Sequence, residues 1–326
     1  MNIEQIKAAA RRLSGNAVRT PLLNAPLLDA KAGRRIFVKA ECLQKTGSFK
    51  YRGARSAISA LAPEARARGI LAYSSGNHAQ GIACAAREMG AKATIVMPKD
   101  APAMKIENTR TYGGEVVLYD RETESRESIG ESLENERGLT LIKPFDNADV
   151  IAGQGTCGLE IAEQAKKLGV SNARVLVCCG GGGLTSGIAL ALAAHAPEMT
   201  VHPVEPEGFD DVARSLALGS VQSNMRNSGS LCDAILTPSP GQLTFPIISA
   251  RCGRGYVVTD TQALQAMAAA YRYLKVILEP GGAVALAAAM SLEEETSDVI
   301  VVASGGNVDK AVLEIALREG ESDAHR

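Results

Sequence analysis

The chain has 326 residues, a length that predicts about two domains, and a formal net charge of −1. Its 35 basic and 36 acidic residues are interspersed and its apolar stretches are too short to span a bilayer, so we expect neither a nucleic-acid nor a membrane partner. Seven cysteines without paired metal-ligand spacing predict buried thiols in a reducing cytoplasm, and four histidines without an HExxH motif disfavour a zinc hydrolase.

Short β-branched segments alternate along the chain with longer Ala-rich segments of helical period. After an amphipathic helix within residues 1–15, strands are predicted at 35–39, 70–74, 93–97, 115–119, 139–142, 174–178, 201–204, 255–259 and 299–303. The longer predicted helices are 77–89, 149–168, 185–195, 261–275 and 308–319, and residues 319–326 are predicted to be a disordered tail. This alternation predicts an α/β fold of doubly wound parallel sheets, in which ligands bind beyond the carboxyl ends of the strands.

Two loops in the first third of the chain contain candidate functional residues. The segment TGSFKYRGA at 46–54 places Lys50 between Phe49 and a helix start. Taken alone, a lysine in this position is more often a solvated surface residue. The segment SSGN at 74–77 precedes a predicted helix, whose free backbone N–H groups suit a carboxylate. The alternative for this segment is an ordinary Ser or Asn helix cap.

Two further loops are rich in glycine. The segment CGGGGLTSG at 179–187 follows a predicted strand. Four consecutive glycines weaken both helices and strands, but they let the backbone approach an anion, and the following helix adds its positive dipole end. A phosphate group is the expected ligand, although the spacing of the glycines fits neither a dinucleotide-binding nor a P-loop motif. The segment ASGGN at 303–307 is a similar strand–turn–helix junction, and alone it could be a mere tight turn.

Together with RTPL at 19–22, these loops resemble the fold-type II pyridoxal-phosphate (PLP) enzymes, in the same order and over essentially the whole chain. This group includes serine and threonine dehydratases and serine racemase. The resemblance implies that Lys50 forms a Schiff base with PLP and that Phe49 flanks the pyridine ring. It also implies that Asn77 binds the 3′ oxygen of the ring and that Ser304 meets its nitrogen. The residues that would cradle the phosphate are Gly180, Gly181, Gly182, Gly183 and Leu184.

The resemblance also implies an architecture of the tryptophan synthase β type. Residues 1–64 and 146–326 would form a large cofactor-binding domain, and residues 65–145 would form a small mobile domain. The cofactor would sit in the cleft between them, and closure of the small domain would exclude water. A homodimer is carried over from the family.

The expected chemistry is β-elimination. A lysine buried beside an imine loses proton affinity and can act as a base at Cα. A serine hydroxyl does not force the pyridine nitrogen to stay protonated, which favours loss of a β-substituent over transamination. Within the family, Lys50 removes the Cα proton and the β-hydroxyl leaves as water. We therefore expect a PLP-dependent dehydratase, a carbon–oxygen lyase that also releases ammonia from a hydroxy amino acid.

Finer motifs resemble the serine racemase and 3-hydroxyaspartate dehydratase subgroup. Ser75 matches a serine that acts as acid and base on the substrate face opposite the lysine. Arg126, which would otherwise be read as part of a solvated helix face, matches an arginine that points into the active site. There it could bind a distal carboxylate through two hydrogen bonds, which makes 3-hydroxyaspartate the expected substrate. The remaining substrate-binding loop would comprise Ser74, Ser75, Gly76, Asn77 and His78.

The segment EPEGFDD at 205–211 resembles the divalent-cation loop of that subgroup. Glu205, Asp211 and the carbonyl of Phe209 would bind Mg²⁺, or else Ca²⁺ or Mn²⁺, since hard cations prefer oxygen ligands. The alternative for this segment is an exposed acidic turn.

Other activities remain open. The main alternatives are an L-serine or L-threonine dehydratase and a serine racemase, although segment 228–240 is richer in serine and proline than we expect of a racemase. The Arg126 region and the cation loop disfavour β-replacement of the cysteine synthase kind. The joint presence of Lys50, Ser75 and Ser304 disfavours a non-catalytic PLP-binding protein.

Overall fold

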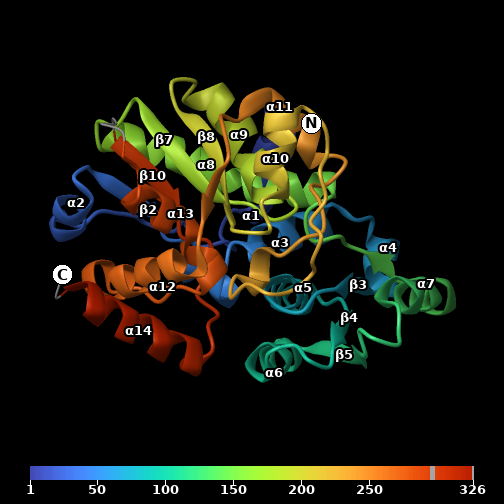
Figure 1. Ribbon diagram of the computed structural model, residues 1–326. Coiled ribbons are helices and arrows are strands. Elements are labelled where there is room, and N and C mark those ends of the chain that lie inside the picture. Colours follow the sequence, from blue (N-terminus) through green and yellow to red (C-terminus); the bar gives the residue numbers. More distant parts are fainter. Residues whose placement is uncertain (294–297, 325–326) are drawn as a thin grey trace.

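The computed structural model describes residues 1–293 and 298–324, whose strands form two sheets (Figure 1). The six-stranded sheet has the order β1-β2-β10-β7-β8-β9, and the four-stranded sheet has the order β5-β4-β3-β6. All pairs are parallel except β1 against β2. The strands are β1 (Leu22–Leu23), β2 (Ile36–Lys39), β3 (Ile70–Tyr73), β4 (Ala93–Pro98), β5 (Gly114–Tyr119), β6 (Thr140–Leu141), β7 (Ala173–Cys178), β8 (Thr200–Pro206), β9 (Tyr256–Val258) and β10 (Asp298–Val302).

The predicted α/β fold with parallel sheets is confirmed, and each predicted strand overlaps an observed one. The antiparallel edge strand β1 was not predicted, because two residues are too short to show an alternating pattern. The helices are α1 (Ile3–Leu13), α2 (Pro26–Ala32), α3 (Lys50–Ala60), α4 (Pro63–Arg68), α5 (Asn77–Glu88), α6 (Ala103–Thr111), α7 (Arg126–Arg137), α8 (Ala148–Lys167), α9 (Gly183–His195), α10 (Asp211–Leu218), α11 (Thr244–Arg251), α12 (Asp260–Ala269), α13 (Pro280–Met290) and α14 (Lys310–Ala324).

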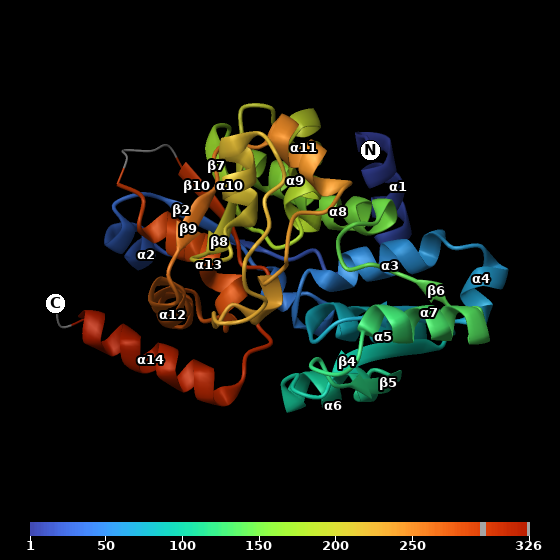
Figure 2. The ribbon, with the colours of Figure 1, turned by 45° about the vertical axis from the view of Figure 1, so that its right-hand side comes forward.

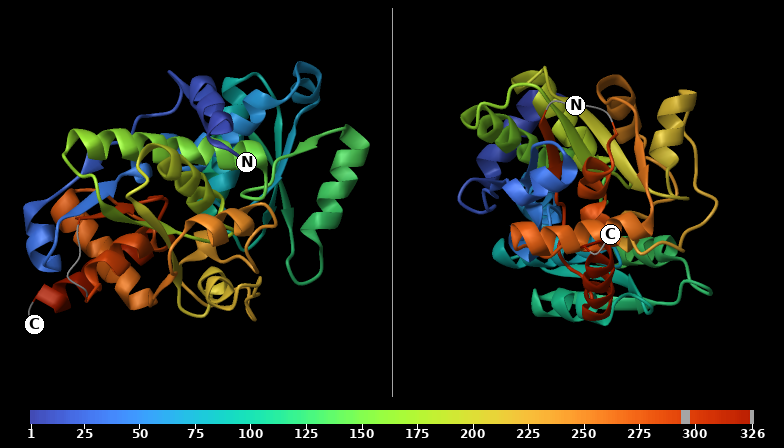
Figure 3. Two further views of the ribbon diagram at one scale, coloured as in Figure 1. Left: turned by 90° about the horizontal axis from the view of Figure 1, so that it is seen from above. Right: turned by 60° about the vertical axis from the view of Figure 1, so that its left-hand side comes forward.

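The central strands β3 and β4 of the four-stranded sheet bury both faces, because their side chains alternate between two apolar clusters. Ile70 and Ala72 of β3 pack in the cluster that includes residues of α5, whereas Leu71 packs with Leu133 of α7. Helix α7 lies on the outer side of these strands, at the right of the left view in Figure 3. Burial on both faces accounts for the nearly continuous apolar sequence of β3 and β4.

Helix α3 connects the two parts of the fold. It packs against α8 of the larger part and against α5 beside the four-stranded sheet. Figure 2 shows α3 between α8 above and α5 below. Because α3 begins at Lys50, this residue lies where the two parts meet.

Two predicted boundaries were wrong. The helix predicted over 261–275 ends as an α-helix at Ala269 and continues as a π-helical turn, Ala270–Leu274, after which Lys275 has a φ of 60°. The residues predicted as a disordered tail are helical in α14 as far as Ala324, and residues 325–326 lie outside the described part of the chain. Within the described residues, no helix is both long enough and apolar enough to span a membrane.

Candidate active site

A cavity of about 440 Å³ lies where loops of the two sheets converge. Loops that follow the carboxyl ends of β3, β6 and β7 line it, at residues 74–78, 143–146 and 180–184. Segment 233–238, the start of α3 and residues of α6 and α7 also line it. This is the position in which parallel α/β sheets place their ligands, and the volume is typical of small-molecule sites.

Lys50 lies in the wall of the cavity at the start of α3. Its Nζ donates a hydrogen bond to the carbonyl oxygen of Pro144 at 3.2 Å and lies 5.1 Å from the centre of the Phe49 ring. Burial lowers the pKa of Lys50 to about 8. At pH 7 about a tenth of an amine with this pKa is unprotonated, far more than for a lysine of ordinary pKa, and this is the form needed for a nucleophile or a base.

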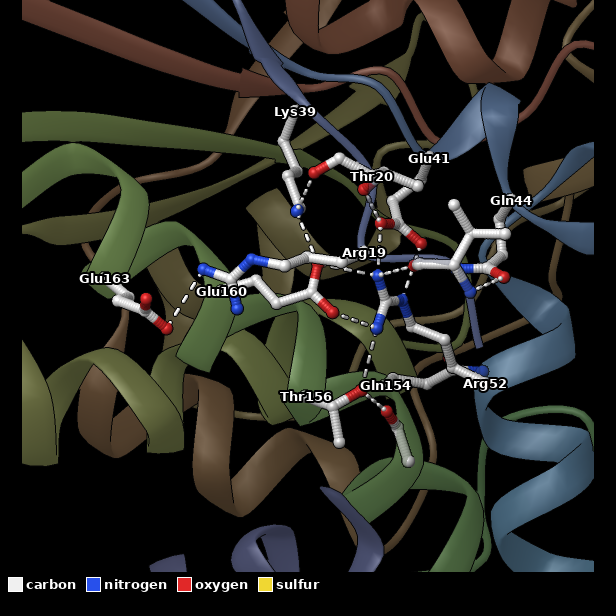
Figure 4. Close-up of polar contacts among 12 residues, drawn as sticks. Arg19, Thr20, Lys39, Glu41, Gln44, Arg52, Gln154, Thr156, Glu160 and Glu163 are labelled. Atoms are coloured by element: carbon white, nitrogen blue, oxygen red, sulfur yellow. Dashed lines mark hydrogen bonds and ion pairs between the residues drawn. The ribbon is translucent and has the colours of Figure 1, made fainter. Parts of the chain in front are cut away.

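A buried ion network fixes α3 two residues after Lys50 (Figure 4). Nε of Arg52 lies 2.7 Å from Oε2 of Glu41, and Nη1 of Arg52 lies 2.7 Å from Oε1 of Glu160. Glu160 also pairs with Nζ of Lys39 at 2.6 Å, so residues of β2, α3 and α8 share one network. Removing one partner of such a buried pair typically costs about 3–5 kcal/mol. The network therefore holds the start of α3 in place against the large sheet.

The predicted carboxylate loop is the turn between β3 and α5. Its residues Ser74 to His78 all line the cavity, and the N–H of Gly76 donates to Oγ of Ser74 at 3.1 Å. The first N–H groups of α5 have no partner within the helix, so they can bind a carboxylate. The His78 imidazole is buried with Nε2 2.9 Å from the Ile142 carbonyl oxygen, and burial lowers its pKa to about 3. His78 is therefore neutral and adds no positive charge to the loop, whereas the N-terminus of α5 contributes positive potential there.

The glycine loop leads from β7 into α9 and also lines the cavity. Gly182 has a φ of +90°, a conformation that other residues adopt only with strain. A Cβ on Gly181 would lie 2.3 Å from the Phe145 ring. The glycines thus permit both the turn and the close packing of Phe145 against it, and the N-terminus of α9 lies at the cavity with its free N–H groups.

Ser304 lies beneath the cavity rather than in its wall. It follows β10, its side chain is 4% exposed, and its carbonyl oxygen accepts a hydrogen bond from the N–H of Phe49 at 3.0 Å. Its hydroxyl is hydrogen-bonded to the thiol of Cys178, which does line the cavity. The structure therefore brings Ser304 close to the predicted cofactor lysine from 254 positions away in the sequence.

Arg126 is the first residue of α7 and lines the mouth of the cavity. Its Nε is 2.7 Å from Oε1 of Glu127, and its guanidinium carbon lies 5.7 Å from the centre of the Tyr73 ring. The side chain is 45% exposed. Arg126 is thus both part of a local ion pair, as its charged surroundings suggested, and within the cavity wall.

Comparison with known proteins agrees with this geometry. Residues 13–306 match the family model described as Pyridoxal-phosphate dependent enzyme. The chain belongs to this family. Similar proteins include an L-threo-3-hydroxyaspartate ammonia-lyase of Pseudomonas sp, 44% identical over 92% of this chain and 93% of its own, and a serine racemase of Oryza sativa subsp. indica, 39% identical over 96% and 92%. The structure of maize serine racemase has a TM-score of 0.91 at 37% identity, covering 100% of this chain and 99% of that one.

The residues of this PLP-dependent enzyme fit the cofactor. Lys50 offers an amine of lowered pKa, and the glycine loop at the start of α9 offers free N–H groups for a phosphate. Asn77 is fixed by its neighbours: Nδ2 donates to Oε1 of Glu279, and Oδ1 accepts from Nδ2 of Asn307 at 2.7 Å. Because the amide carries two hydrogens, one N–H of Asn77 remains for a ring oxygen.

Several residues of the site were not predicted from the sequence. Nζ of Lys105 lies 2.8 Å from Oδ2 of Asp233 and 3.5 Å from Oε2 of Glu279. Burial opposes the charge of Lys105, but the two carboxylates outweigh it and raise its pKa, while burial raises the pKa of Glu279 to about 6. No local motif marks these residues. By contrast, Lys143 and Phe145 follow β6, and the general rule about carboxyl ends of strands could have identified them.

The predicted cation site lies outside the cavity, between β8 and α10. Glu205 and Asp211 are both buried, and Phe209 lies between them in the chain with 3% exposure. The Glu205 carboxylate accepts the N–H groups of Val212 and Ala213 at 2.9 and 2.7 Å. Burial raises the pKa of Asp211 to about 6, and its Oδ2 has no hydrogen-bond partner. An exposed acidic turn is therefore excluded at Glu205 and Asp211, and the buried Oδ2 of Asp211, which has no hydrogen-bond partner, fits the role of a cation ligand.

This site is small. Among the described residues, no group of three or more His, Cys, Asp and Glu side chains is placed to hold a metal ion. A cation at Glu205 and Asp211 would therefore depend on carbonyl oxygens and waters for its other ligands, as Mg²⁺ and Ca²⁺ commonly do.

Proposed function

We propose that the protein is a PLP-dependent lyase that converts a 3-hydroxyaspartate into iminosuccinate and water, after which hydrolysis gives oxaloacetate and ammonia. One observation carries the substrate assignment: the cavity that contains Lys50 also has Arg126 in its wall. Serine and threonine offer no second carboxylate to this arginine, whereas 3-hydroxyaspartate does. The 44% identity to the ammonia-lyase of Pseudomonas sp supports the same substrate class.

The roles of the residues follow from their positions. The cofactor, when bound, supplies an electron sink for the negative charge at Cα. The N–H groups of the Ser74–His78 loop hold the α-carboxylate, and Arg126 holds the distal one. Nζ of Lys50 removes the proton at Cα, and Ser75 holds a proton on the other side of the substrate. The β-hydroxyl leaves as water, so no oxidant or second substrate is needed.

Water must be kept from the reacting carbon during these steps. We infer that residues 65–145, which contain all strands of the four-stranded sheet, form a small domain that closes on the substrate. Residues 1–64 and 146–326 form the large domain. Closure moves Arg126 toward the substrate, because α7 belongs to the small domain.

A second activity, dehydration of L-serine or L-threonine, is favoured by the Arg126–Glu127 ion pair. An arginine already paired at 2.7 Å leaves no unpaired charge when a smaller substrate binds. Serine racemisation is related chemistry, because Ser75 could return a proton to Cα.

Measuring activity on a set of hydroxy amino acids tests the proposal. We expect ammonia and 2-oxo acid release from at least one 3-hydroxyaspartate stereoisomer. Its kcat/KM should be about a hundredfold or more above that for L-serine and L-threonine, because only its distal carboxylate can accept charged hydrogen bonds from Arg126. All four stereoisomers and D-serine are measured in parallel. A higher kcat/KM for serine or threonine than for every hydroxyaspartate isomer would contradict the substrate assignment but would leave the elimination chemistry in place.

We further propose that Glu205, Asp211 and the Phe209 carbonyl bind Mg²⁺ or Ca²⁺, with waters as the remaining ligands. Chelation is expected to lower the melting temperature, because a cation at 100 times its Kd contributes about 2.7 kcal/mol of stability. Added Mg²⁺ or Ca²⁺ should restore it. Asp211→Asn should remove this response, whereas Glu207→Gln, at an exposed position of the same turn, should keep it. An unchanged melting temperature after metal analysis has verified removal would contradict the site.

The quaternary structure and the location are further proposals. A homodimer follows from the family resemblance alone. A cytoplasmic location is supported by the cysteines, all seven of which are free thiols and six of which are buried.

A further inference from the structure

Besides Lys50, one cation in the described cavity wall has no ion pair to balance its charge. Nζ of Lys105 is paired with Asp233 at 2.8 Å, and Nε of Arg126 is paired with Glu127 at 2.7 Å. Lys143 has no ion pair or side-chain hydrogen bond with any residue that the structure describes, and its side chain is exposed at the cavity. The charged residues of the wall are Lys50, Lys105, Arg126, Lys143, Glu127, Asp146 and Asp233.

The unpaired charge of Lys143 affects substrate binding because the charge of Arg126 is partly neutralised by Glu127. A carboxylate that approaches Arg126 also approaches Glu127, so Glu127 offsets part of the attraction to Arg126. Asp146 adds a further negative charge, although its Oδ1 accepts the N–H of Leu243 at 2.7 Å. A substrate with two carboxylates therefore needs another positive charge in this wall, and Lys143 provides one.

The backbone places Lys143 beside the reaction centre. It immediately precedes Pro144, whose carbonyl oxygen accepts the hydrogen bond from Lys50 at 3.2 Å. Strands β3 and β6 are parallel, with Ile70 paired to Thr140 and Leu71 to Leu141. Continuing that register puts Lys143 level with Tyr73.

Tyr73 is the residue over whose ring the guanidinium of Arg126 lies, at 5.7 Å. Lys143 and Arg126 therefore occupy the same edge of the four-stranded sheet, both at the cavity. Lys143 has a flexible four-carbon side chain and three N–H donors. It can therefore donate hydrogen bonds to the same carboxylate that Arg126 binds.

We propose that Lys143 is a specificity-determining residue that binds the distal carboxylate of a dicarboxylic substrate together with Arg126. This inference rests on the proposed function and deepens it, because it identifies the charge that selects dianionic substrates. The phosphate of the cofactor, when bound, would be a second anion that Lys143 could contact, so the test must separate binding of the phosphate from binding of the substrate carboxylate.

The test uses the PLP-loaded enzyme and two non-reacting probes of equal carbon number, succinate and butyrate. The binding of each is measured by calorimetry in wild type, Lys143→Gln and Lys143→Arg. We expect Lys143→Gln to raise the Kd for succinate about tenfold, the effect of losing one charged hydrogen bond, and Lys143→Arg to recover most of it. The ratio of kcat/KM for hydroxyaspartate to that for serine should fall by a similar factor. Lys99→Gln, which removes the same charge from an exposed position outside the cavity, is the matched control.

Three results would overturn the inference. These are no succinate binding by wild type, an unchanged succinate Kd in Lys143→Gln, and an equal loss for succinate and butyrate. Weaker PLP binding in Lys143→Gln with unchanged succinate binding would assign Lys143 to the phosphate instead. A wild type that prefers serine would contradict only the proposed function, because the succinate measurement still decides the role of Lys143.

Discussion

Replacing Lys50 with alanine is expected to abolish turnover, with kcat lowered at least about 10⁴-fold, because both the covalent attachment and the base at Cα are lost. The visible absorbance of the covalently held cofactor should disappear as well. Lys50 makes a single side-chain hydrogen bond, to Pro144, so the variant should fold. Absorbance spectra of purified protein and ammonia release measure the two effects.

Lys45→Ala is the matched control. Lys45 is the nearest lysine in the chain, but it is bound to Glu88 at 2.8 Å and does not line the cavity. This variant should keep the cofactor absorbance and most of the activity. A Lys50→Ala protein that retained both covalent cofactor and turnover would show that the assignment of the whole site is wrong.

Replacing Arg126 with alanine is expected to lower kcat/KM for 3-hydroxyaspartate about a hundredfold relative to that for L-serine. The distal carboxylate would lose its planar two-point partner and would face Glu127 without the compensating arginine. The substrate preference should therefore collapse, whereas serine dehydration should remain measurable.

Arg121→Ala serves as the control for this variant. Arg121 is also exposed and paired, to Asp100 at 2.8 Å, but it does not line the cavity. It should leave the ratio of the two kcat/KM values unchanged. An unchanged ratio in Arg126→Ala would contradict the substrate-binding role of Arg126 and would show that it is a solvated helix residue.

The architecture and much of the cavity could be predicted from the sequence, because their signals lie in consecutive residues. Apolar β-branched segments specify buried strands whatever their partners are, and the loops after β3 and β7 carry their chemistry in four or five adjacent residues. The motif around Lys50 and the four glycines at the start of α9 therefore predicted the cofactor lysine and the phosphate loop, and both segments line the same cavity. The π-helical end of α12 was missed because the sequence keeps its helical period through Leu274.

The tertiary structure decided which charges remain free, since an ion pair depends on segments that are distant in the chain. Lys105 and Glu279 are 174 positions apart, and neither carries a local signal of its partner. The burial that makes His78 neutral, and the parallel register that sets Lys143 level with Tyr73, likewise exist only once the strands are assembled. The sequence by itself thus determined the cofactor class and the reaction. The balance of charge around the substrate was decided by packing, because burial and pairing set the energy of every ionised group.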